Sequence, residues 1–415
     1  MKKVLMIAYH FPPQTGSSGI QRTLRFVQQL PEFGWEPIVL TAHPRAYERI
    51  SDDLLSDIPG RTVVKRAFAL DTGRHLAVRG RYPGFLARPD RWVTWKFGAV
   101  PAGLALIRKY QPQAIWSTYP IATAHAIGIE LSSRSGLPWI ADFRDPMVQP
   151  GYPPHPTTLM KFQQIEEATI QKSHLSIFTT PGAAREYRRR YPAAADRIVV
   201  LENGFDEASF AGIVFDPTTA APLNRNAITL LHSGVVYPSE RDPTQLFAAI
   251  ARLVAQRRLK PGEFLIRFRA AGHDEFLREL AHRNSVDAFI EVMPPISYGA
   301  ALEEMHAAEA LLVLQAADCN DQIPAKVYEY LRAGRPILAL TDPIGDTAGV
   351  MRDAGIDMVA RLDSVDEIAE TLDRFIGLIR SGRAPVPDPQ YVADASRRGR
   401  AQSLASFLDR VAPAQ

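Results

Sequence analysis

The sequence predicts an α/β protein with two domains, each a doubly wound parallel sheet, that face each other across a cleft. The chain has 415 residues, 46% of them hydrophobic and 22% charged, which is enough for two domains with separate cores. In both halves, short apolar segments typical of strands alternate with longer segments typical of helices. No sequence repeat relates the two halves. We therefore expect two sheets of the same type but of unrelated sequence.

In the first half, an expected strand at 2–8 leads into a glycine-rich loop at 10–22, where a helix starts. Gly16 and Gly19 allow the backbone to approach a ligand closely. The loop lacks the G-x-G-x-x-G spacing of dinucleotide sites. Arg22 ends the loop, either as a cation near a phosphate or as a surface arginine of the first helix.

A strongly basic stretch follows the second expected strand, 36–41. Residues 61–109 contain eleven Lys or Arg and two acidic residues, a local net charge of +9. Aromatic side chains are interleaved with these charges: Tyr82, Phe85, Trp92, Trp95 and Phe97. This mixture suits a membrane surface, where aromatic rings lie at headgroup depth and basic groups meet anionic lipid. The alternative is a solvated loop region with two buried tryptophans. No nucleic-acid motif accompanies the charges, so we expect no nucleic-acid partner.

Three charged residues follow a strand that begins at Trp139. This strand delivers Asp142, Arg144 and Asp145 to the carboxyl edge of the sheet, where open α/β sheets bind their ligands. The two carboxylates can accept hydrogen bonds from a sugar, and Arg144 can pair with a phosphate. Alternatively, Arg144 holds its own loop by pairing with one of the aspartates.

Composition also predicts where the domains end. Further strands complete the first sheet, at 114–118, 175–179 and 197–201. We expect an N-terminal domain at 1–210, followed by a linker at 211–226 that is rich in Pro, Ala and Thr. The second domain spans 227–392, and a last helix is expected at 393–415.

The second half starts with an expected strand at 228–231, which leads to Gly234. Arg241 stands at the start of the helix that follows. Tyr298 ends a proline-rich loop. The next strands of this half are expected at 264–270, 289–292 and 310–314.

The most informative stretch is 318–343, which reads as a loop, a short helix, a stop and a strand. Pro324 is tolerated in a first helical turn, and Gly334 suits the left-handed residue after the last turn. Lys326 lies in the first turn, where a cation opposes the helix dipole, so a shared phosphate ligand is a good reason for it. Glu329 lies one turn later and can accept two hydrogen bonds from a ribose diol. The alternative is an ordinary exposed Lys–Glu helical pair.

This stretch resembles the donor-site signature of retaining glycosyltransferases of family 4, which have the GT-B fold. One sub-group, the bacterial polysaccharide and lipid-linked-sugar transferases, reads Pro-Ser-Lys-x-Tyr-Glu-Tyr. The matching residues here are Pro324, Lys326, Tyr328, Glu329 and Tyr330. The family also has two acidic residues eight positions apart, and these fall on Asp321 and Glu329.

The resemblance implies two Rossmann-like domains facing a cleft, with the last helix crossing back onto the first domain. It implies a metal-independent retaining enzyme that moves a sugar from a UDP- or GDP-sugar co-substrate, with no other cofactor. The acceptor is expected to be a carbohydrate or a lipid-linked molecule, and the role is expected in cell-surface polysaccharide synthesis. Consistent with a metal-independent site, the segment around Arg144 has no Asp-x-Asp motif.

The resemblance also implies roles for individual residues. Arg241 and Lys326 face the departing diphosphate, and His125 contacts the donor sugar. The remaining donor-binding residues are Gly234, Tyr298, Asp321, Ile323, Pro324, Ala325 and Glu329. The acceptor-binding residues are Gly16, Gly19, Arg22, Asp142, Arg144 and Asp145.

The chain departs from the family pattern at Asp321, Val235 and Glu240. Many members have Glu where Asp321 stands, and Arg and Lys where Val235 and Glu240 stand. There are two rival functions, and these departures suggest the second of them. An epimerase or hydrolase of the same fold would turn over the donor without acceptor, and a non-catalytic sugar-nucleotide-binding partner would bind it without any reaction.

The single cysteine, Cys319, excludes a disulfide framework and suits a reducing cytoplasm. The apolar start at 4–8 is too short for a signal peptide, and 97–107 is too short to span a bilayer. We expect a cytoplasmic protein without a transmembrane helix, at the inner face of the membrane if 61–109 contacts lipid.

Overall fold

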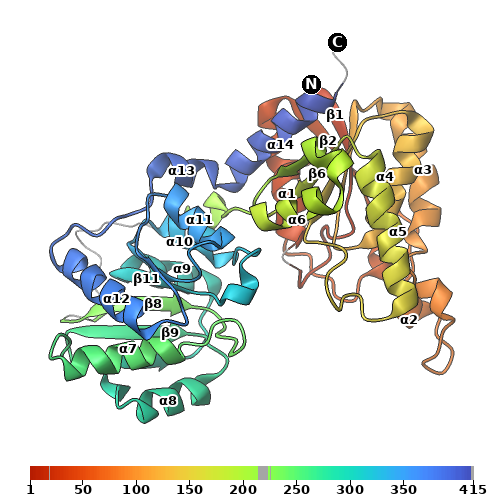
Figure 1. Cartoon of the computed structure of the whole chain (residues 1–415). Coiled ribbons are helices and arrows are strands. Elements are labelled where there is room, and N and C mark those ends of the chain that lie inside the picture. Colours follow the sequence, from red (N-terminus) through yellow and green to blue (C-terminus); the bar gives the residue numbers. More distant parts are fainter. Residues whose placement is uncertain (18, 214–222, 225, 413–415) are drawn as a thin grey trace. The chain divides into compact units, whose positions relative to one another are not determined.

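The computed structural model describes residues 1–17, 19–213, 223–224 and 226–412 (Figure 1). The chain forms two compact units. Unit 1 consists of Met1–Asn203 with Arg397–Gln415, and unit 2 consists of Gly204–Ser396. Most of the predicted linker, 211–226, and the end of the predicted last helix lie outside the described residues.

Unit 1 is built on a parallel sheet, seven-stranded over the described residues, in the order β3-β2-β1-β4-β5-β6-β7. Its strands are β1 (Lys2–Ile7), β2 (Trp35–Ala42), β3 (Val63–Ala67), β4 (Ala114–Thr118), β5 (Trp139–Arg144), β6 (Leu175–Phe178) and β7 (Ile198–Val200). Its helices are α1 (Gly19–Gln29), α2 (Thr72–His75), α3 (Trp95–Tyr110), α4 (Ala122–Ser135), α5 (Pro156–Lys172), α6 (Pro181–Arg190) and α14 (Arg397–Val411). The strand order reverses between β1 and β4, which is where a doubly wound sheet binds ligands at its carboxyl edge.

Both faces of this sheet are covered, because alternate residues of β1 point to opposite sides. Val4 and Met6 pack in a core with residues of α1 and α14, whereas Leu5 and Ile7 pack in a second core with residues of α3 and α4. The last helix, α14, is therefore part of unit 1. Its Asp409 accepts hydrogen bonds from Lys2 Nζ of β1 and from Trp35 Nε1 of β2.

Unit 2 contains a second parallel sheet, six-stranded over the described residues, in the order β10-β9-β8-β11-β12-β13. Its strands are β8 (Ile228–Ser233), β9 (Phe264–Arg269), β10 (Ile290–Met293), β11 (Ala310–Leu314), β12 (Ile337–Leu340) and β13 (Val359–Ala360). Its helices are α7 (Thr244–Ala255), α8 (Asp274–Arg283), α9 (Tyr298–Ala307), α10 (Lys326–Ala333), α11 (Asp346–Asp353), α12 (Val365–Arg380) and α13 (Pro389–Asp394). The predicted class of two doubly wound parallel sheets is confirmed.

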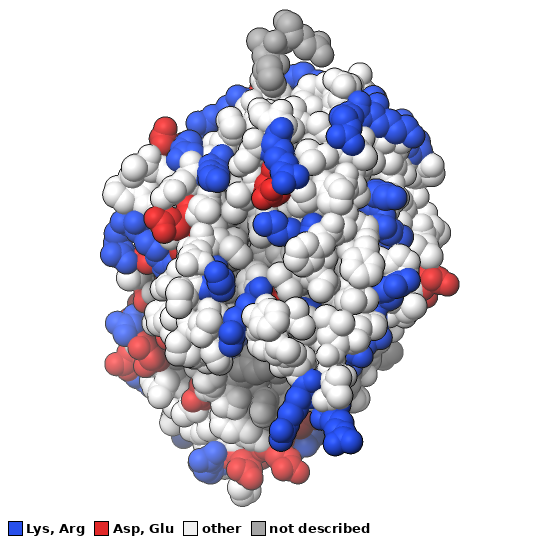
Figure 2. All heavy atoms as spheres, turned by 90° about the vertical axis from the view of Figure 1, so that its right-hand side faces the viewer, with Lys and Arg blue, Asp and Glu red and all other residues white. Residues whose placement is uncertain are grey.

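The structure corrects part of the expected membrane surface. Trp95 has no exposed surface and lies in a core of unit 1, and Trp92 is partly buried against Tyr9 with ring centroids 4.7 Å apart. Phe85 and Phe97 remain 70% and 75% exposed. Figure 2 shows the side on which α2 and α3 lie in Figure 1, where Lys and Arg side chains are spread over the face. Within the described part of the chain, every helix is too short or too polar to cross a membrane.

Candidate functional site

The start of α10 is held at the carboxyl edge of the unit 2 sheet by a short chain of hydrogen bonds. His232, at the end of β8, lies with its Nδ1 3.0 Å from the carbonyl oxygen of Leu312. The imidazole must donate to that carbonyl, which leaves Nε2 as an acceptor. Lys326 Nζ lies 3.1 Å from this Nε2. The neutral imidazole therefore accepts a hydrogen bond from the Lys326 ammonium group and fixes its position.

The charge of Lys326 is poorly compensated by the protein. Burial, followed by the nearby Arg241 guanidinium, lowers the pKa of Lys326 to about 7, against a smaller opposing effect of Glu329. Burial and Lys326 also hold the pKa of His232 well below its usual value. An anion bound beside Lys326 would offset the effects of burial and of Arg241 on its pKa, and so favour the ammonium form.

Gly234 is required at the end of β8 for two reasons. Its φ of +120° is rarely adopted by residues with a side chain. A Cβ atom added to it would lie 2.9 Å from Lys326 Nζ. The backbone of Gly234 therefore lies against the Lys326 ammonium group.

Glu329 and Tyr298 come together from different helices. Tyr298 opens α9 and is 55% exposed, and its hydroxyl donates to Glu329 Oε1 over 2.7 Å. An exposed aromatic ring and a carboxylate in contact suit a base and the ribose attached to it. Tyr330, on the buried face of α10, accepts a hydrogen bond from the Ser233 backbone N–H over 2.8 Å, which fixes α10 against β8.

Arg241 lies before α7 and reaches the same loop. Its Nη1 donates to the carbonyl oxygen of Val235 over 2.7 Å, and its guanidinium lies over the Tyr237 ring. A small pocket is lined by Arg241 and by residues of the loop before α10, together Glu240, Arg241, Gln315, Cys319, Gln322, Ile323 and Pro324. Asp321 and Ala325 are exposed on this loop.

Cys319 is a free, buried cysteine whose pKa favours the protonated thiol. Burial, followed by Asp318 and Glu240, raises the pKa of Cys319 to about 11. A thiolate is the reactive form, so this cysteine is unreactive at neutral pH.

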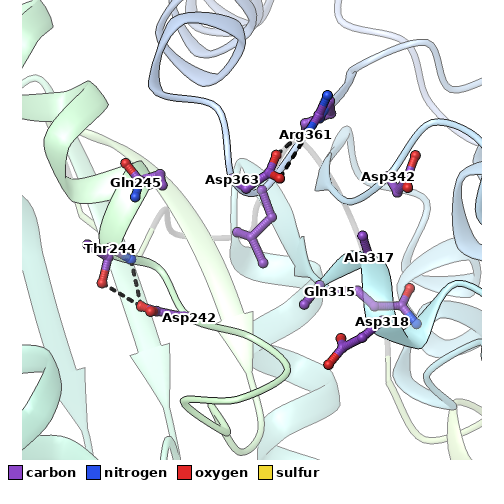
Figure 3. A pocket seen from close by; sticks show the side chains of 11 residues that line it. Asp242, Thr244, Gln245, Gln315, Ala317, Asp318, Asp342, Arg361 and Asp363 are labelled. Atoms are coloured by element: carbon purple, nitrogen blue, oxygen red, sulfur yellow. Dashed lines mark hydrogen bonds and ion pairs between the residues drawn. The ribbon is translucent and has the colours of Figure 1, made fainter.

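A second hollow in unit 2 does not suit a phosphate. A cavity of about 270 Å³ opens beside the ends of β11, β12 and β13 (Figure 3). Its charged lining residues are Asp242, Asp318, Arg361, Asp342 and Asp363. The one arginine among them is already paired with Asp363 at 3.0 Å. The excess of carboxylates would repel an anion.

In unit 1, Arg22 and Asp142 form a buried ion pair. Arg22 Nε lies 2.9 Å from Asp142 Oδ2, and Asp142 is fully buried. The other donors of Arg22 reach the backbone carbonyls of Leu201 and Glu202 at 2.9 and 3.0 Å. These contacts give both side chains a structural role, which joins α1 to β5 and β7.

Gly19 and Arg144 do meet, as their predicted shared site requires. A Cβ atom on Gly19 would collide with the Arg144 guanidinium and lie 2.8 Å from His10 Nδ1. His10 Nδ1 is 3.2 Å from Ser17 Oγ in the same loop. Gly16 is exposed with a φ of +83°.

Arg144 has an uncommon backbone conformation and, in the part of the chain that the structure describes, a buried nitrogen atom without a hydrogen bond. Its φ of 59° is uncommon for a residue with a side chain. Its Nε is buried and has no hydrogen-bond partner among the described residues. Burial lowers the pKa of Arg144, even though the exposed Asp145 opposes this. Burial and Arg144 lower the pKa of His10 to about 4, so His10 is neutral at physiological pH.

His125 is placed in the core of unit 1, not on a ligand-facing surface. It has no exposed surface, its Nδ1 lies 2.8 Å from Ser117 Oγ, and its ring lies beside Tyr119 and Phe143. Burial lowers the pKa of His125 to about 3. The ring therefore offers no exposed surface to the predicted donor sugar.

Sequence reasoning missed two histidines, His10 and His232. Both stand at or just after the carboxyl end of a strand, and both precede a glycine-containing turn. That position is the available signal, since the carboxyl edge is where such sheets bind ligands. Among the described residues, no group of three or more His, Cys, Asp or Glu is arranged to hold a metal ion.

Comparison with known proteins agrees with this geometry. Residues 18–204 match a family model described as a glycosyl transferase 4-like domain. No significantly similar sequence was found among curated proteins.

Several solved structures have the same two-domain arrangement of elements. A glycosyltransferase from Rickettsia africae ESF-5 is 11% identical, covers 99% of this chain and 98% of its own, and gives a TM-score of 0.65. HepE of Anabaena in complex with UDP is 14% identical, with coverages of 99% and 97% and a TM-score of 0.59. The lipopolysaccharide outer core galactosyltransferase WaaB in its apo form is 12% identical, with coverages of 98% and 99% and a TM-score of 0.61. At these identities the likeness shows the fold, and the predicted GT-B fold is confirmed.

Proposed function

We propose that the protein is a glycosyltransferase that moves a sugar from a nucleotide-diphosphate donor to a carbohydrate or lipid-linked acceptor. The observation that carries this proposal is the start of α10, where Lys326, held by His232, lies beside Gly234 and one turn from Glu329. The domain match over 18–204 supports the reaction class. The GT-B fold and the UDP complex of HepE support a nucleotide donor, with UDP as the first candidate.

The donor is bound by unit 2 in this proposal. Glu329 accepts hydrogen bonds from the ribose hydroxyls, and the exposed ring of Tyr298 packs against the base. The diphosphate lies between Lys326 and Arg241, beside the loop at 321–325. The positive end of the α10 dipole adds to this environment, while the Val327 and Tyr328 N–H groups are bonded to the carbonyls of Pro324 and Ala325.

Catalysis then consists mainly of stabilising the leaving group. Breaking the anomeric C–O bond places negative charge on the departing diphosphate. Lys326 and Arg241 face that charge in a partly buried site, where fixed charges act more strongly than in water. Each hydrogen bond to a charged group is worth about 1.5 to 3 kcal/mol, so two cations account for a substantial part of the rate. No bound metal is needed for this neutralisation, and we propose a metal-independent reaction.

The finer features of the proposal come from the family signature at 324–330. They are retention of the anomeric configuration, a hexose donor and a role in cell-surface polysaccharide synthesis. We also propose that unit 1 binds the acceptor and contacts the inner face of the cell membrane through the exposed part of 61–109. Such a protein would act at the cytoplasmic side, where nucleotide sugars meet lipid-linked acceptors.

Thermal-shift screening of the full chain tests the donor site. UDP, GDP and ADP, with their common sugars, are compared on the wild type, Glu329→Ala and Glu303→Ala. Glu303 is an exposed carboxylate on the neighbouring helix α9 and serves as the matched control. A ligand at about 100 times its dissociation constant adds roughly 2.7 kcal/mol of stability. We expect one nucleotide family to stabilise the wild type and Glu303→Ala but not Glu329→Ala. Stabilisation of none would overturn the proposal.

A further inference from the structure

We infer that His10, Ser17, Gly19 and Arg144 form a phosphate-binding site, here called the Arg144 site, and, resting on the proposed function, that this phosphate belongs to the acceptor. The acceptor would then be a phosphate-bearing molecule, such as a sugar linked to a lipid phosphate, rather than a neutral glycan. No part of the proposed donor site contributes to this group of residues, which lies entirely in unit 1.

The first step concerns the charged residues at the carboxyl end of β5. Asp142 is the fully buried carboxylate nearest in sequence, and it is paired with Arg22. Arg144 forms no ion pair with any described residue, and its Nε is buried without a hydrogen-bond partner. The Arg144 side chain is partly buried, and its desolvated Nε donor, which has no partner in the described part of the chain, is costly. An incoming anion would accept this hydrogen bond and also neutralise the charge, whereas a neutral hydroxyl would supply the hydrogen bond alone.

The second step is the geometry around the guanidinium. Gly19 is the first residue of α1, an 11-residue helix, and its missing side chain leaves the room that Arg144 occupies. The Gly19 and Ile20 N–H groups of this first turn are hydrogen-bonded to Ser17, so it is the positive end of the helix dipole that favours an anion here. A cation in this position opposes the helix dipole, and a shared anion resolves the conflict. Lys326 presents the same combination in unit 2.

The third step identifies phosphate among anions. The planar guanidinium offers parallel N–H donors, and the Ser17 hydroxyl offers a donor from another direction. Ser17 Oγ also accepts from the Gly19 N–H over 3.3 Å and contacts His10 Nδ1, so the loop itself is held in place. Donors that converge from an arginine and a hydroxyl-bearing loop, beside the positive end of a helix, suit the several oxygens of a phosphate better than a planar carboxylate.

Inorganic pyrophosphate, titrated into the full-length protein and followed by phosphorus NMR and calorimetry, tests the site. Lys326→Met removes one of the two donor cations, so the part of the surviving binding that is lost in Arg144 variants reports the Arg144 site. We expect Arg144→Met and Gly19→Ala, each combined with Lys326→Met, to weaken that remaining binding by at least about tenfold. Gly19→Ala keeps every charge and displaces the Arg144 guanidinium and the neighbouring His10 ring, so it remains informative if Arg144→Met fails to fold. Matched controls are Arg108→Met, an exposed arginine of unit 1, and Gly60→Ala, where an added Cβ meets no atom within 4 Å.

The outcomes separate the two sources of phosphate. Binding of the nucleotide diphosphate that is unchanged in Arg144→Met, with loss of the second pyrophosphate site, supports an acceptor phosphate. Equal loss of both would assign Arg144 to the donor diphosphate and overturn the acceptor assignment. Absence of pyrophosphate binding in Lys326→Met would overturn the site itself. A nucleotide affinity that is the same in the wild type, Lys326→Met and Glu329→Ala would instead count against the proposed function. It would leave the Arg144 site intact.

Discussion

At the scale of single residues, the most informative side chain is Lys326. A cation at a helix start is unfavourable, and burial beside Arg241 adds to the cost. His232 accepts a hydrogen bond from Lys326 but carries no compensating charge. The molecule therefore keeps a cation in an environment that disfavours it, which is typical of a group whose partner is a ligand.

The pH dependence of nucleotide binding follows from the pKa of Lys326, which is about 7 in the free protein. Below this pH the ammonium form is already present, and above it binding must be accompanied by uptake of a proton. We expect the affinity for a nucleotide diphosphate to fall as the pH rises from about 7 to about 9, by up to about tenfold per pH unit. Calorimetry over this range would measure it.

Lys326→Arg provides the comparison, because a guanidinium stays charged over this range. Its affinity should be nearly constant with pH, whereas Lys260→Arg, at an exposed lysine of unit 2, should keep the wild-type slope. An equal slope in wild type and Lys326→Arg would rule out Lys326 as the titrating group.

At the scale of elements, the junction of α1 with β5 shows what holds unit 1 together. Arg22 and Asp142 are 120 positions apart and form a buried ion pair whose remaining donors cap the end of β7. The pair fixes the glycine loop relative to the loop that carries Arg144. Its role is to position the Arg144 site, and it makes no contact with ligand in our account.

We expect Arg22→Met to destabilise the protein by about 3 to 5 kcal/mol, because it leaves Asp142 buried and unpaired. The double variant Arg22→Met/Asp142→Leu should recover most of this loss. Urea denaturation measures both, with Arg45→Met at an exposed position as the control. A change of under about 1 kcal/mol in Arg22→Met would show that the pair contributes little.

The bounds of helices and strands were predicted best where the residue types at an element's end mark that end. β11 has the predicted bounds, and α10 ends before Gly334 because that residue takes the left-handed conformation, with a φ of 67°. Side-chain partners were predicted worst. Arg22 and His125 were assigned to ligands because their local sequence fits such roles, but their surroundings come from distant segments: Asp142 for Arg22, and Ser117 with Phe143 for His125. The local periodicity of a sequence cannot predict contacts between segments that are far apart in the chain.

At the scale of the whole molecule, strand and helix alternation was enough to predict two doubly wound sheets. The same reasoning could predict that donor residues gather at one sheet edge, since parallel strands end together. It could not predict that Trp95 lies in the core while Phe97, two positions later on the same helix, is exposed. That difference depends on which face of α3 meets the sheet.

The exposed aromatic residues and basic charges of 61–109 predict binding to anionic membranes. The wild type should co-sediment with vesicles that contain phosphatidylglycerol, and less so as salt is raised, because screening weakens charge attraction. Phe85→Ser/Phe97→Ser should reduce binding, whereas Ile344→Ser, at an 81% exposed position of unit 2, should not. Equal binding to neutral vesicles at all salt concentrations would contradict the proposed surface.

The central claim is that the start of α10 binds the donor diphosphate, and calorimetric titration of the nucleotide chosen by the screen tests it most directly. Wild type, Glu303→Ala, Glu329→Ala and Lys326→Met are compared at about pH 7, where Lys326 takes up its charge. The account predicts saturable binding to the wild type and Glu303→Ala, weakened by at least about tenfold in the other two. Binding of the same strength in all four proteins, or no binding to the wild type, would contradict it.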